Sequence, residues 1–252
     1  MADGAVAALH RFPVKGLSPE RLRQVELETG AYVPGDRLLA FENGPSGYDE
    51  AAPRHLPKAV FLMLMRDERL AKLKTAYWDG HLKVRLEGRD ACEGDTRTPE
   101  GRAALESFMA GFCAEALKGA PRLREAGAGF RFTDSRSGYV SLLNLASVAA
   151  LEQAIGRPVD PLRFRANIAF AGPPAWNEND WVGRQLRIGG VRLAVTSTTE
   201  RCAATEVDPT TGARDMRVVR TLVKRFGHNL CGVYCSVLEG GLVREGDPLE
   251  LL

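Results

Sequence analysis

The chain has few histidines and lacks the common motifs of nucleotide-binding proteins and hydrolases. Only 4 histidines occur among its 252 residues and no HExxH is present, which argues against a histidine-rich zinc site. The sequence contains neither GxGxxG nor GxxxxGKS/T, so it has no dinucleotide fingerprint and no P-loop. GxSxG is also absent, and the carboxylates are scattered without an obvious acid–base pair. Any catalysis is therefore expected to depend on a bound cofactor.

The chain also lacks a strong net charge and any apolar run long enough to cross a bilayer. Its formal net charge is +2, which gives no general case for binding nucleic acid or an anionic membrane. No secretory signal is evident at the N-terminus, MADGAVAALHRF. The number of cysteines is odd, so a disulfide framework is not expected among Cys92, Cys113, Cys202, Cys231 and Cys235. The sequence predicts a soluble, cytoplasmic protein with no nucleic-acid partner and no membrane partner.

Short apolar runs separated by glycine and proline fill the first 95 residues, a pattern typical of β-strands joined by turns. Asp79-Gly80 lies between two alternating segments and predicts a hairpin turn. The apolar run AVFLMLM (59–65) contains methionines, which we interpret as filling gaps in the core. Further strands are expected at 9–14, 22–27 and 36–42.

The hydrophobic period changes to that of a helix after Thr98. Thr98 is a good N-cap, Pro99 suits the first helical position, and apolar residues recur on one face as far as Cys113, which we expect in the core. The following segment, 118–130, has the composition of a linker. We therefore expect two domains, 1–120 and 121–252.

The second half predicts another helix and a set of barrel strands. The helix is expected to be capped at Asn144 or Ser147 and to end before Gly156. LRIGGVRLAV (186–195) predicts a hairpin, and the alternating segments after residue 228 predict the closing strands of a β-barrel. The basic segment between them predicts a short amphipathic helix or turn.

PLRFRANIAFAG (161–172) predicts a strand with polar side chains on one face. Two-residue alternation would place Arg163, Arg165 and Asn167 in one row. Such a row is usually a solvated face, although the apolar residues between and after them make the segment otherwise core-like.

Cys202 differs from the other cysteines because polar residues surround it. It follows Arg201 within TSTTERCAATEVDPTTG (196–212), where a predicted strand gives way to a loop. Free cysteine is usually a small buried hydrophobe, so two interpretations are open: a metal ligand or nucleophile, or inert packing. Cys231 and Cys235 do not have the spacing of CxxC, and we interpret both as packing residues.

Four segments carry a resemblance to a known family: PVKG (13–16), FRAN (164–167), ERCAATEVDPTTG (200–212) and FGHNL (226–230). Their order and spacing resemble those of MOSC-domain proteins with an N-terminal β-barrel domain, which include the mitochondrial amidoxime-reducing component and its bacterial relatives. The resemblance covers nearly the whole chain. It implies a mainly β, α+β fold in which a barrel-like N-terminal domain precedes a β-barrel MOSC domain. It also implies a molybdenum cofactor (molybdopterin), a pterin with a phosphate tail, between the two domains.

The resemblance also implies roles for individual residues. Cys202 occupies the position of the cysteine that ligates molybdenum, which makes it the implied catalytic and metal-binding residue. A thiolate suits a transition metal, and guanidinium groups suit a phosphate, so the residue types agree with these roles. The implied cofactor-binding residues are Lys15, Gly16, Arg37, Arg54, Ser137, Arg165, Asn167, Arg201 and Asn229.

The chain departs from the family pattern at three places. Gly16 stands where a serine is usual, Ala166 stands where a proline is usual, and the segment around Arg54 differs from the family's TARQ-like sequence. Some relatives carry a C-terminal [2Fe–2S] ferredoxin domain, whereas this chain ends at Leu252. Electrons are therefore expected from a separate donor protein of the ferredoxin or flavoprotein type.

The implied activity is a molybdenum-dependent oxidoreductase that reduces small N-hydroxylated or N-oxide compounds. Two electrons and two protons would release the substrate oxygen as water. Two alternatives stay open. MOSC domains also occur in cofactor sulfurases, so the chain could be a sulfur carrier or a molybdenum-cofactor maturation or binding module, although it lacks a pyridoxal-phosphate-dependent desulfurase domain. It could also be a β-barrel binding protein without a redox role, because fold alone does not fix function.

Overall fold

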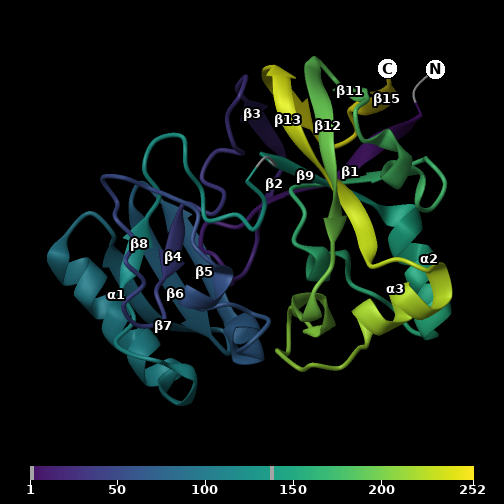
Figure 1. Cartoon of the computed structure of the whole chain (residues 1–252). Coiled ribbons are helices and arrows are strands. Elements are labelled where there is room, and N and C mark those ends of the chain that lie inside the picture. The colour runs from purple at the N-terminus through teal and green to yellow at the C-terminus, as the bar shows by residue number, and fades with distance from the viewer. Residues whose placement is uncertain (1–2, 137–138) are drawn as a thin grey trace.

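The chain forms two lobes, one of which is a β-barrel (Figure 1). The computed structural model describes residues 3–136 and 139–252. Seven strands of this part of the chain close the barrel in the order β1-β10-β9-β13-β12-β11-β15, because β1 pairs with both β10 and β15. Their bounds are β1 Gly4–Arg11, β9 Val140–Asn144, β10 Ile168–Ala171, β11 Gln185–Ile188, β12 Val191–Glu200, β13 Leu230–Glu239 and β15 Pro248–Leu251. The predicted α+β fold with a barrel is confirmed.

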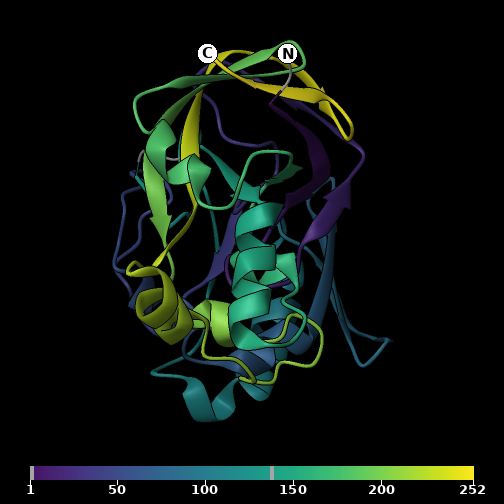
Figure 2. The same cartoon turned by 90° about the vertical axis from the view of Figure 1, so that its right-hand side faces the viewer.

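Alternating apolar side chains fill the barrel interior, as expected for strands with one buried face. Leu142, Phe170 and Leu193 are each at most 1% exposed. Two helices, α2 (Leu145–Ile155) and α3 (Val218–Phe226), lie below the barrel, and both chain ends lie at its top (Figure 2). The helices bury a separate apolar cluster between themselves and the barrel.

The other lobe is built from small sheets and one helix. β4 (Leu39–Phe41) pairs with β8 (Leu123–Glu125), and the second sheet has the order β5-β6-β7. The helix α1 packs on these sheets, and Leu105 and Met109 of the helix are buried there. The bounds are β5 Leu73–Trp78, β6 His81–Leu86, β7 Arg89–Asp95 and α1 Pro99–Phe112.

The remaining elements are short. β2 (Glu20–Leu22) extends the barrel sheet at β1, and β3 (Gln24–Leu27) pairs with β14 (Gly241–Arg244). Six 3₁₀ turns in the described residues are η1 Lys58–Val60, η2 Glu68–Lys72, η3 Ala114–Ala116, η4 Pro161–Phe164, η5 Asn177–Trp181 and η6 Ala203–Glu206.

Local capping residues explain the helix ends. Thr98 Oγ1 accepts a hydrogen bond from Gly101 N at 3.1 Å, and Pro99 occupies the first turn of α1. Asn144 caps α2 in the same way through Ala146 N at 3.0 Å, and Gly156 ends α2 in the left-handed conformation. Both helix predictions are confirmed.

The predicted strand over 161–172 is wrong in its first half. Asp160 Oδ1 accepts a hydrogen bond from Leu162 N at 2.8 Å and caps the turn η4. Arg165 then adopts the left-handed conformation, with φ of 54°, and the strand β10 begins only at Ile168. The expected one-face row of Arg163, Arg165 and Asn167 does not form, because a turn cannot keep two-residue alternation.

Two of the other predicted strands are displaced or shortened. The strand expected at 9–14 is β1, which begins earlier and ends at Arg11, and only the centre of 36–42 forms β4. The segment expected at 22–27 divides into β2 and β3. In the apolar run 59–65, the described backbone has no strand, and Met63 is buried.

The division into domains 1–120 and 121–252 stays a prediction. The pairing of β1 with β10 joins a strand from the first residues to one from the second half. In the other lobe, β4 from before residue 120 pairs with β8 from after it. In each lobe, therefore, a strand from before residue 120 is hydrogen-bonded to a strand from after it. No helix within 3–136 or 139–252 combines the length and apolar character needed to span a bilayer.

Candidate functional site

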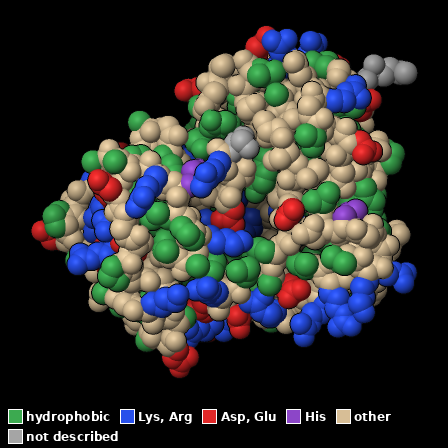
Figure 3. Space-filling view, in the orientation of Figure 1, with side chains coloured by type: hydrophobic (Ala, Val, Ile, Leu, Met, Phe, Trp, Pro, Cys, Tyr) green, Lys and Arg blue, Asp and Glu red, His purple; other side chains and the backbone are tan. Residues whose placement is uncertain are grey.

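A cavity of about 620 Å³ lies between the two lobes. Figure 3 shows Lys, Arg, Asp and Glu side chains within the hollow where the lobes meet. Six cationic residues line it, against three acidic ones. The cationic residues are Lys15, Lys58, Arg37, Arg163, Arg165 and Arg201, and the acidic ones are Asp36, Asp134 and Glu200. The excess of positive charge suits an anionic ligand.

The cavity brings together most of the residues that the sequence singled out. Lys15, Gly16, Arg37, Arg165, Asn167, Arg201 and Cys202 all line it. Arg54 is exposed and is not among the lining residues, and neither is the side chain of Asn229. Ser137 lies outside the described residues.

Arg37 and Arg165 share one aromatic ring at the centre of the cationic cluster. Their guanidinium carbons lie 5.0 Å and 4.3 Å from the centroid of Phe12. Arg37 forms an ion pair with the buried carboxylate of Asp36 and donates a hydrogen bond to Arg165 O at 2.9 Å. Both arginines have positive φ, which for non-glycine residues is uncommon and often found at functional sites.

The two arginines differ in how their charge is compensated. Burial would lower the pKa of Arg37, but Asp36 outweighs it and the pKa is raised. Arg165 donates a hydrogen bond to Leu17 O at 2.6 Å but forms no ion pair in the described part of the chain. Burial and the nearby charge of Arg37 lower the pKa of Arg165 to about 9. Arg165 is therefore a partly buried cation that Asp36 and Asp134 compensate only in part, without a direct ion pair in the described chain.

Lys15 reaches the same cavity from the turn after β1. Its Nζ donates to Asp134 Oδ1 at 2.6 Å and to Phe132 O at 3.0 Å. Burial lowers the pKa of Lys15, with Asp134 opposing that effect. Burial would raise the pKa of Asp134, but Lys15 and the neighbouring cations outweigh it and the pKa is lowered. The pair is thus held in its charged form near neutral pH.

Gly16 follows Lys15 with a φ of 82°, a conformation that L side chains rarely adopt. A side chain there would also meet Leu62 O at 3.2 Å. The backbone conformation therefore favours glycine after PVK in this chain.

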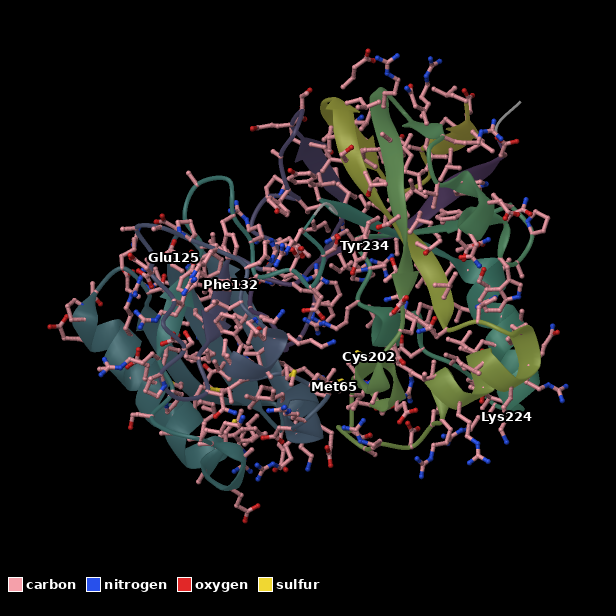
Figure 4. The ribbon with its side chains drawn as sticks, in the orientation of Figure 1. Met65, Glu125, Phe132, Cys202, Lys224 and Tyr234 are labelled. Atoms are coloured by element: carbon pink, nitrogen blue, oxygen red, sulfur yellow. The ribbon has the colours of Figure 1, made fainter. Side chains whose placement is uncertain are left out.

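Cys202 lies where β12 ends and η6 begins. Its carbonyl accepts hydrogen bonds from Thr205 N at 3.0 Å and from Thr205 Oγ1 at 2.9 Å, which fixes the backbone of the turn. Figure 4 shows Cys202 on the barrel side of the cavity and Met65 on the side of the other lobe. Cys202 is half-buried and lines the cavity. It is thus accessible to a ligand in the cavity.

The other cysteines agree with the packing interpretation to different degrees. Cys113, Cys231 and Cys235 are buried, and burial raises the pKa of Cys113 and of Cys231 to about 12. Cys92 is only half-buried on β7. Among the described residues, no group of three or more His, Cys, Asp or Glu side chains is placed to hold a metal ion.

Arg201 and Asn167 line the cavity, but their polar atoms are already engaged by the protein. Arg201 donates to Phe164 O at 2.8 Å and to Cys231 O, through Nε at 2.7 Å and through Nη2. Asn167 Oδ1 accepts from Ser141 N and Oγ, and its Nδ2 donates to His10 O at 3.2 Å. These contacts hold the cavity wall in place.

Arg163 also performs a structural task. Its guanidinium is buried and bonds to Asp208 at 3.1 Å and to Asp215 at 2.9 Å. Asp208 Oδ1 in turn accepts from Thr210 N and Thr211 N, which shapes the VDPTTG turn. The VDPTTG motif therefore forms a turn that Arg163 anchors through Asp208.

Sequence reasoning missed several residues of the cavity. Asp36 directly precedes Arg37, and Asp134 lies within the TDSRSG loop, so their positions beside predicted basic residues were a usable signal. Thr199 on β12 is buried, and its hydroxyl has no hydrogen-bond partner among the described residues. Met63 and Met65 also line the cavity, and Met63 is buried as well. No local signal separates such lining residues from core residues.

The fold and site define an α+β protein with a thiol and a cationic cluster in one interlobe cavity. Residues 130–250, just under half of the chain, match the model of the MOSC domain, so this part of the chain is a MOSC domain.

Curated relatives match part of the chain. The mitochondrial amidoxime-reducing component 1 of Xenopus laevis is 31% identical over 122 residues, which cover 44% of this chain and 35% of that protein. The mitochondrial amidoxime reducing component 2 of Bos taurus is also 31% identical over 122 residues, covering 44% and 36%. The molybdenum cofactor sulfurase 2 of Culex quinquefasciatus is 32% identical over 97 residues, covering 36% and 12%. The chain spans about a third of the length of the amidoxime-reducing components that it matches.

Among solved structures, the YUAD protein from Bacillus subtilis aligns with a TM-score of 0.48 at 14% identity, covering 98% of this chain and 94% of that one. YiiM from Escherichia coli aligns with a TM-score of 0.36 at 20% identity, covering 47% and 56%.

Proposed function

We propose that the protein binds a molybdenum cofactor in the interlobe cavity, with molybdenum on Cys202, and reduces N-hydroxylated or N-oxide compounds. One observation carries the proposal: Cys202 and the cluster of Lys15, Arg37 and Arg165 line the same cavity. A metal-binding thiol and an anion-binding cluster are the two features that a phosphate-bearing metal cofactor requires. The names of the amidoxime-reducing relatives support the reaction class.

The residues present fit such a group. Arg165 is a partly buried cation without a direct carboxylate partner in the described chain, and an anionic ligand would compensate its charge. The unpartnered hydroxyl of Thr199 offers a buried hydrogen-bonding group to a polar ligand. A cavity of about 620 Å³ lies within the range of small-molecule and cofactor sites.

Each cavity residue then has a defined task. Arg165 and Arg37 would bind the phosphate through guanidinium groups already oriented by Phe12. Lys15, held by Asp134, would add a point charge to the same anion. Arg201 and Asn167 keep the wall rigid through their backbone partners, which preserves the position of Cys202. When bound, the group supplies a metal that exchanges two electrons with the substrate.

The reaction is tested with purified protein from a molybdenum-replete host, an aromatic amidoxime as substrate and reduced viologen as electron source. The wild-type protein is expected to form the amidine, and Cys202→Ser to lose at least about 99% of this activity, because the metal would lose its protein ligand. Cys92→Ser, a half-buried cysteine outside the cavity, is the matched control and should keep its activity. Equal rates for Cys202→Ser and the wild type, with equal metal content, would refute the proposal.

A sulfur-carrier or cofactor-maturation role is the second candidate, and the similarity to a molybdenum cofactor sulfurase favours it. In that case Cys202 would carry a persulfide instead of binding metal. Mass spectrometry after incubation with a cysteine desulfurase and cysteine separates the two. A gain of one sulfur atom on Cys202 in metal-free protein supports the carrier, and an unmodified Cys202 supports the reductase.

A further inference from the structure

The outer side of α3 carries a cluster of basic side chains, which we call the α3 basic face. It consists of Arg217, which precedes the helix, and Arg220, Lys224 and Arg225 within it. All four are exposed, and none forms an ion pair in the described part of the chain. Figure 3 shows blue side chains gathered at the place where Figure 1 has α3. The chain's net charge is only +2, so this concentration of one sign is local.

A surface groove of about 480 Å³ lies beside this face, between α3 and η6. Val219 and Val223 form its apolar part, and Val223 is 52% exposed. Arg220 and Lys224 also line the groove, whereas its acidic lining residue, Glu206, is only 9% exposed. The groove therefore combines a small apolar centre with two exposed cations beside it, a composition that suits an acidic partner.

The turn η6 separates this groove from the interlobe cavity. Cys202, Ala204 and Thr205 line the cavity, whereas Ala203 and Glu206 line the groove. The wall between the two is therefore one turn of backbone. In Figure 4, Lys224 lies on the outer side of α3, away from the cavity that Cys202 lines. A partner seated in the groove would contact the residue bonded directly to Cys202.

We propose that the groove and the α3 basic face form the docking site for a small acidic protein that carries electrons. This inference rests on the proposed function, because it assigns the entry point of the electrons that the reduction consumes. A one-electron carrier would dock twice for each substrate. Two reduced carriers would be oxidised and two protons consumed as the N–O bond breaks. For an N-hydroxyl group one proton joins the oxygen and the other replaces it on nitrogen, whereas the oxygen of an N-oxide takes both, and in each case the oxygen leaves as water.

The shape of the surface favours an acidic protein over an anionic membrane. A helix that lies in a membrane interface presents a broad apolar face to the lipid. Val218 and Leu222 of α3 are instead buried in the apolar cluster between the helices and the barrel, which leaves little apolar surface outside. Complementary charge around a small apolar centre serves fast, salt-dependent association between proteins.

The test is a binding titration of the holoenzyme with an oxidised plant-type [2Fe–2S] ferredoxin, a strongly acidic electron carrier. We expect binding that weakens by about tenfold between 50 mM and 300 mM salt. The charge reversal Arg220→Glu with Lys224→Glu should weaken it by at least about tenfold at low salt, and the neutral pair Arg220→Gln with Lys224→Gln by less. Arg89→Glu with Arg244→Glu, two exposed arginines far from the groove, is the matched control and should bind like the wild type.

Activity separates this proposal from the proposed function. The charge-reversal protein should keep viologen-driven reduction but lose most ferredoxin-driven reduction. Ferredoxin binding and ferredoxin-driven rates that equal those of the wild type would overturn the docking site while leaving the reductase intact. If viologen-driven reduction is absent from the wild type, the proposed function fails, and the titration still decides whether the surface binds an acidic protein. Binding to phosphatidylserine vesicles in place of ferredoxin, abolished by the same reversal, would also overturn the proposal.

Discussion

Arg37 and Arg165 lie against the same ring of Phe12, yet only Arg37 has a carboxylate partner in the described chain. Asp36, 2% exposed, compensates Arg37 and orients it. Among the described residues, the side chain of Arg165 donates a hydrogen bond to the carbonyl of Leu17 alone. Arg37 is therefore held by the protein through Asp36, whereas the charge of Arg165 is available to a ligand.

Replacing Arg165 should reduce ligand binding far more than stability. Arg165→Met removes a partly buried charge without an ion-pair partner in the described chain and adds apolar packing on Phe12, so the melting temperature of the cofactor-free protein should stay within about 4 °C, or roughly 1 kcal/mol. Cofactor content should fall by about tenfold or more, because a charge-assisted phosphate contact is lost. Thermal unfolding and pterin content are the two measurements. A large loss of stability with normal pterin content would show that Arg165 is structural.

The opposite balance is expected for Arg201, which also lines the cavity. Arg201→Met leaves the carbonyls of Phe164 and Cys231 without this donor. Since unsatisfied buried polar groups are costly, the free energy of unfolding should fall by about 2–4 kcal/mol. Urea denaturation of the cofactor-free protein measures this change. A difference below about 0.5 kcal/mol would mean that the backbone contacts of Arg201 are unimportant.

Arg214 joins the two lobes below Cys202. It donates to Ala203 O at 2.7 Å on the barrel side, and to Met65 O at 3.0 Å and Glu68 on the other lobe. Because the residue is partly exposed, Arg214→Ala should cost only about 1 kcal/mol of unfolding free energy. The cofactor should nevertheless dissociate several times faster, since the cavity lies between the lobes that Arg214 joins. Arg97→Ala, which loses ion pairs within one lobe, is the control and should release the cofactor at the wild-type rate.

Anion binding should weaken at alkaline pH because of Lys15. Burial lowers the pKa of Lys15 below its ordinary value of 10.5, so the cation is lost at a lower pH than in a free lysine. The affinity of the cofactor-free protein for inorganic phosphate, measured by calorimetry from pH 8 to 10.5, should fall as pH rises through this lowered pKa. In the same window the unfolded chain keeps its proton while the folded chain loses it. The contribution of Lys15 to the free energy of unfolding therefore rises with pH.

Lys15→Met provides the matched control for both effects. It should bind phosphate weakly at every pH, and its stability should lack this rise. A wild-type affinity that is flat from pH 8 to 10.5 would show that the ammonium of Lys15 does not contact the anion.

Local signals explain which parts of the fold could be predicted. Thr98 with Pro99, and Asn144 with Gly156, mark helix ends through hydrogen bonds and backbone conformations that involve only neighbouring residues. The Asp79-Gly80 turn of the β5–β6 hairpin is also local, and both residues have positive φ as such a turn requires. The strand predicted around Arg165 was wrong because Asp160 caps the turn η4 there, a local signal that the two-residue alternation concealed.

Long-range pairing explains what the sequence could not predict. The barrel closes through β1 and β10, whose residues Leu9 and Ile168 are far apart in sequence. Nothing local indicates this pairing. The motif residues could be named from the sequence, but their tasks could not. Asn167 and Arg201 turned out to bind the backbone of the cavity wall, which depends on where the carbonyls of His10 and Phe164 lie.

The most direct test of the central claim is metal analysis of protein expressed in a molybdenum-replete host. The wild-type protein and Cys92→Ser should each contain about one molybdenum atom per chain, while Cys202→Ser should contain almost none. Retained pterin in Cys202→Ser would agree with anchoring of the phosphate by Arg165 and Arg37. Molybdenum content that is unchanged by Cys202→Ser, or absent from the wild type, would contradict the assignment of Cys202 as the metal ligand.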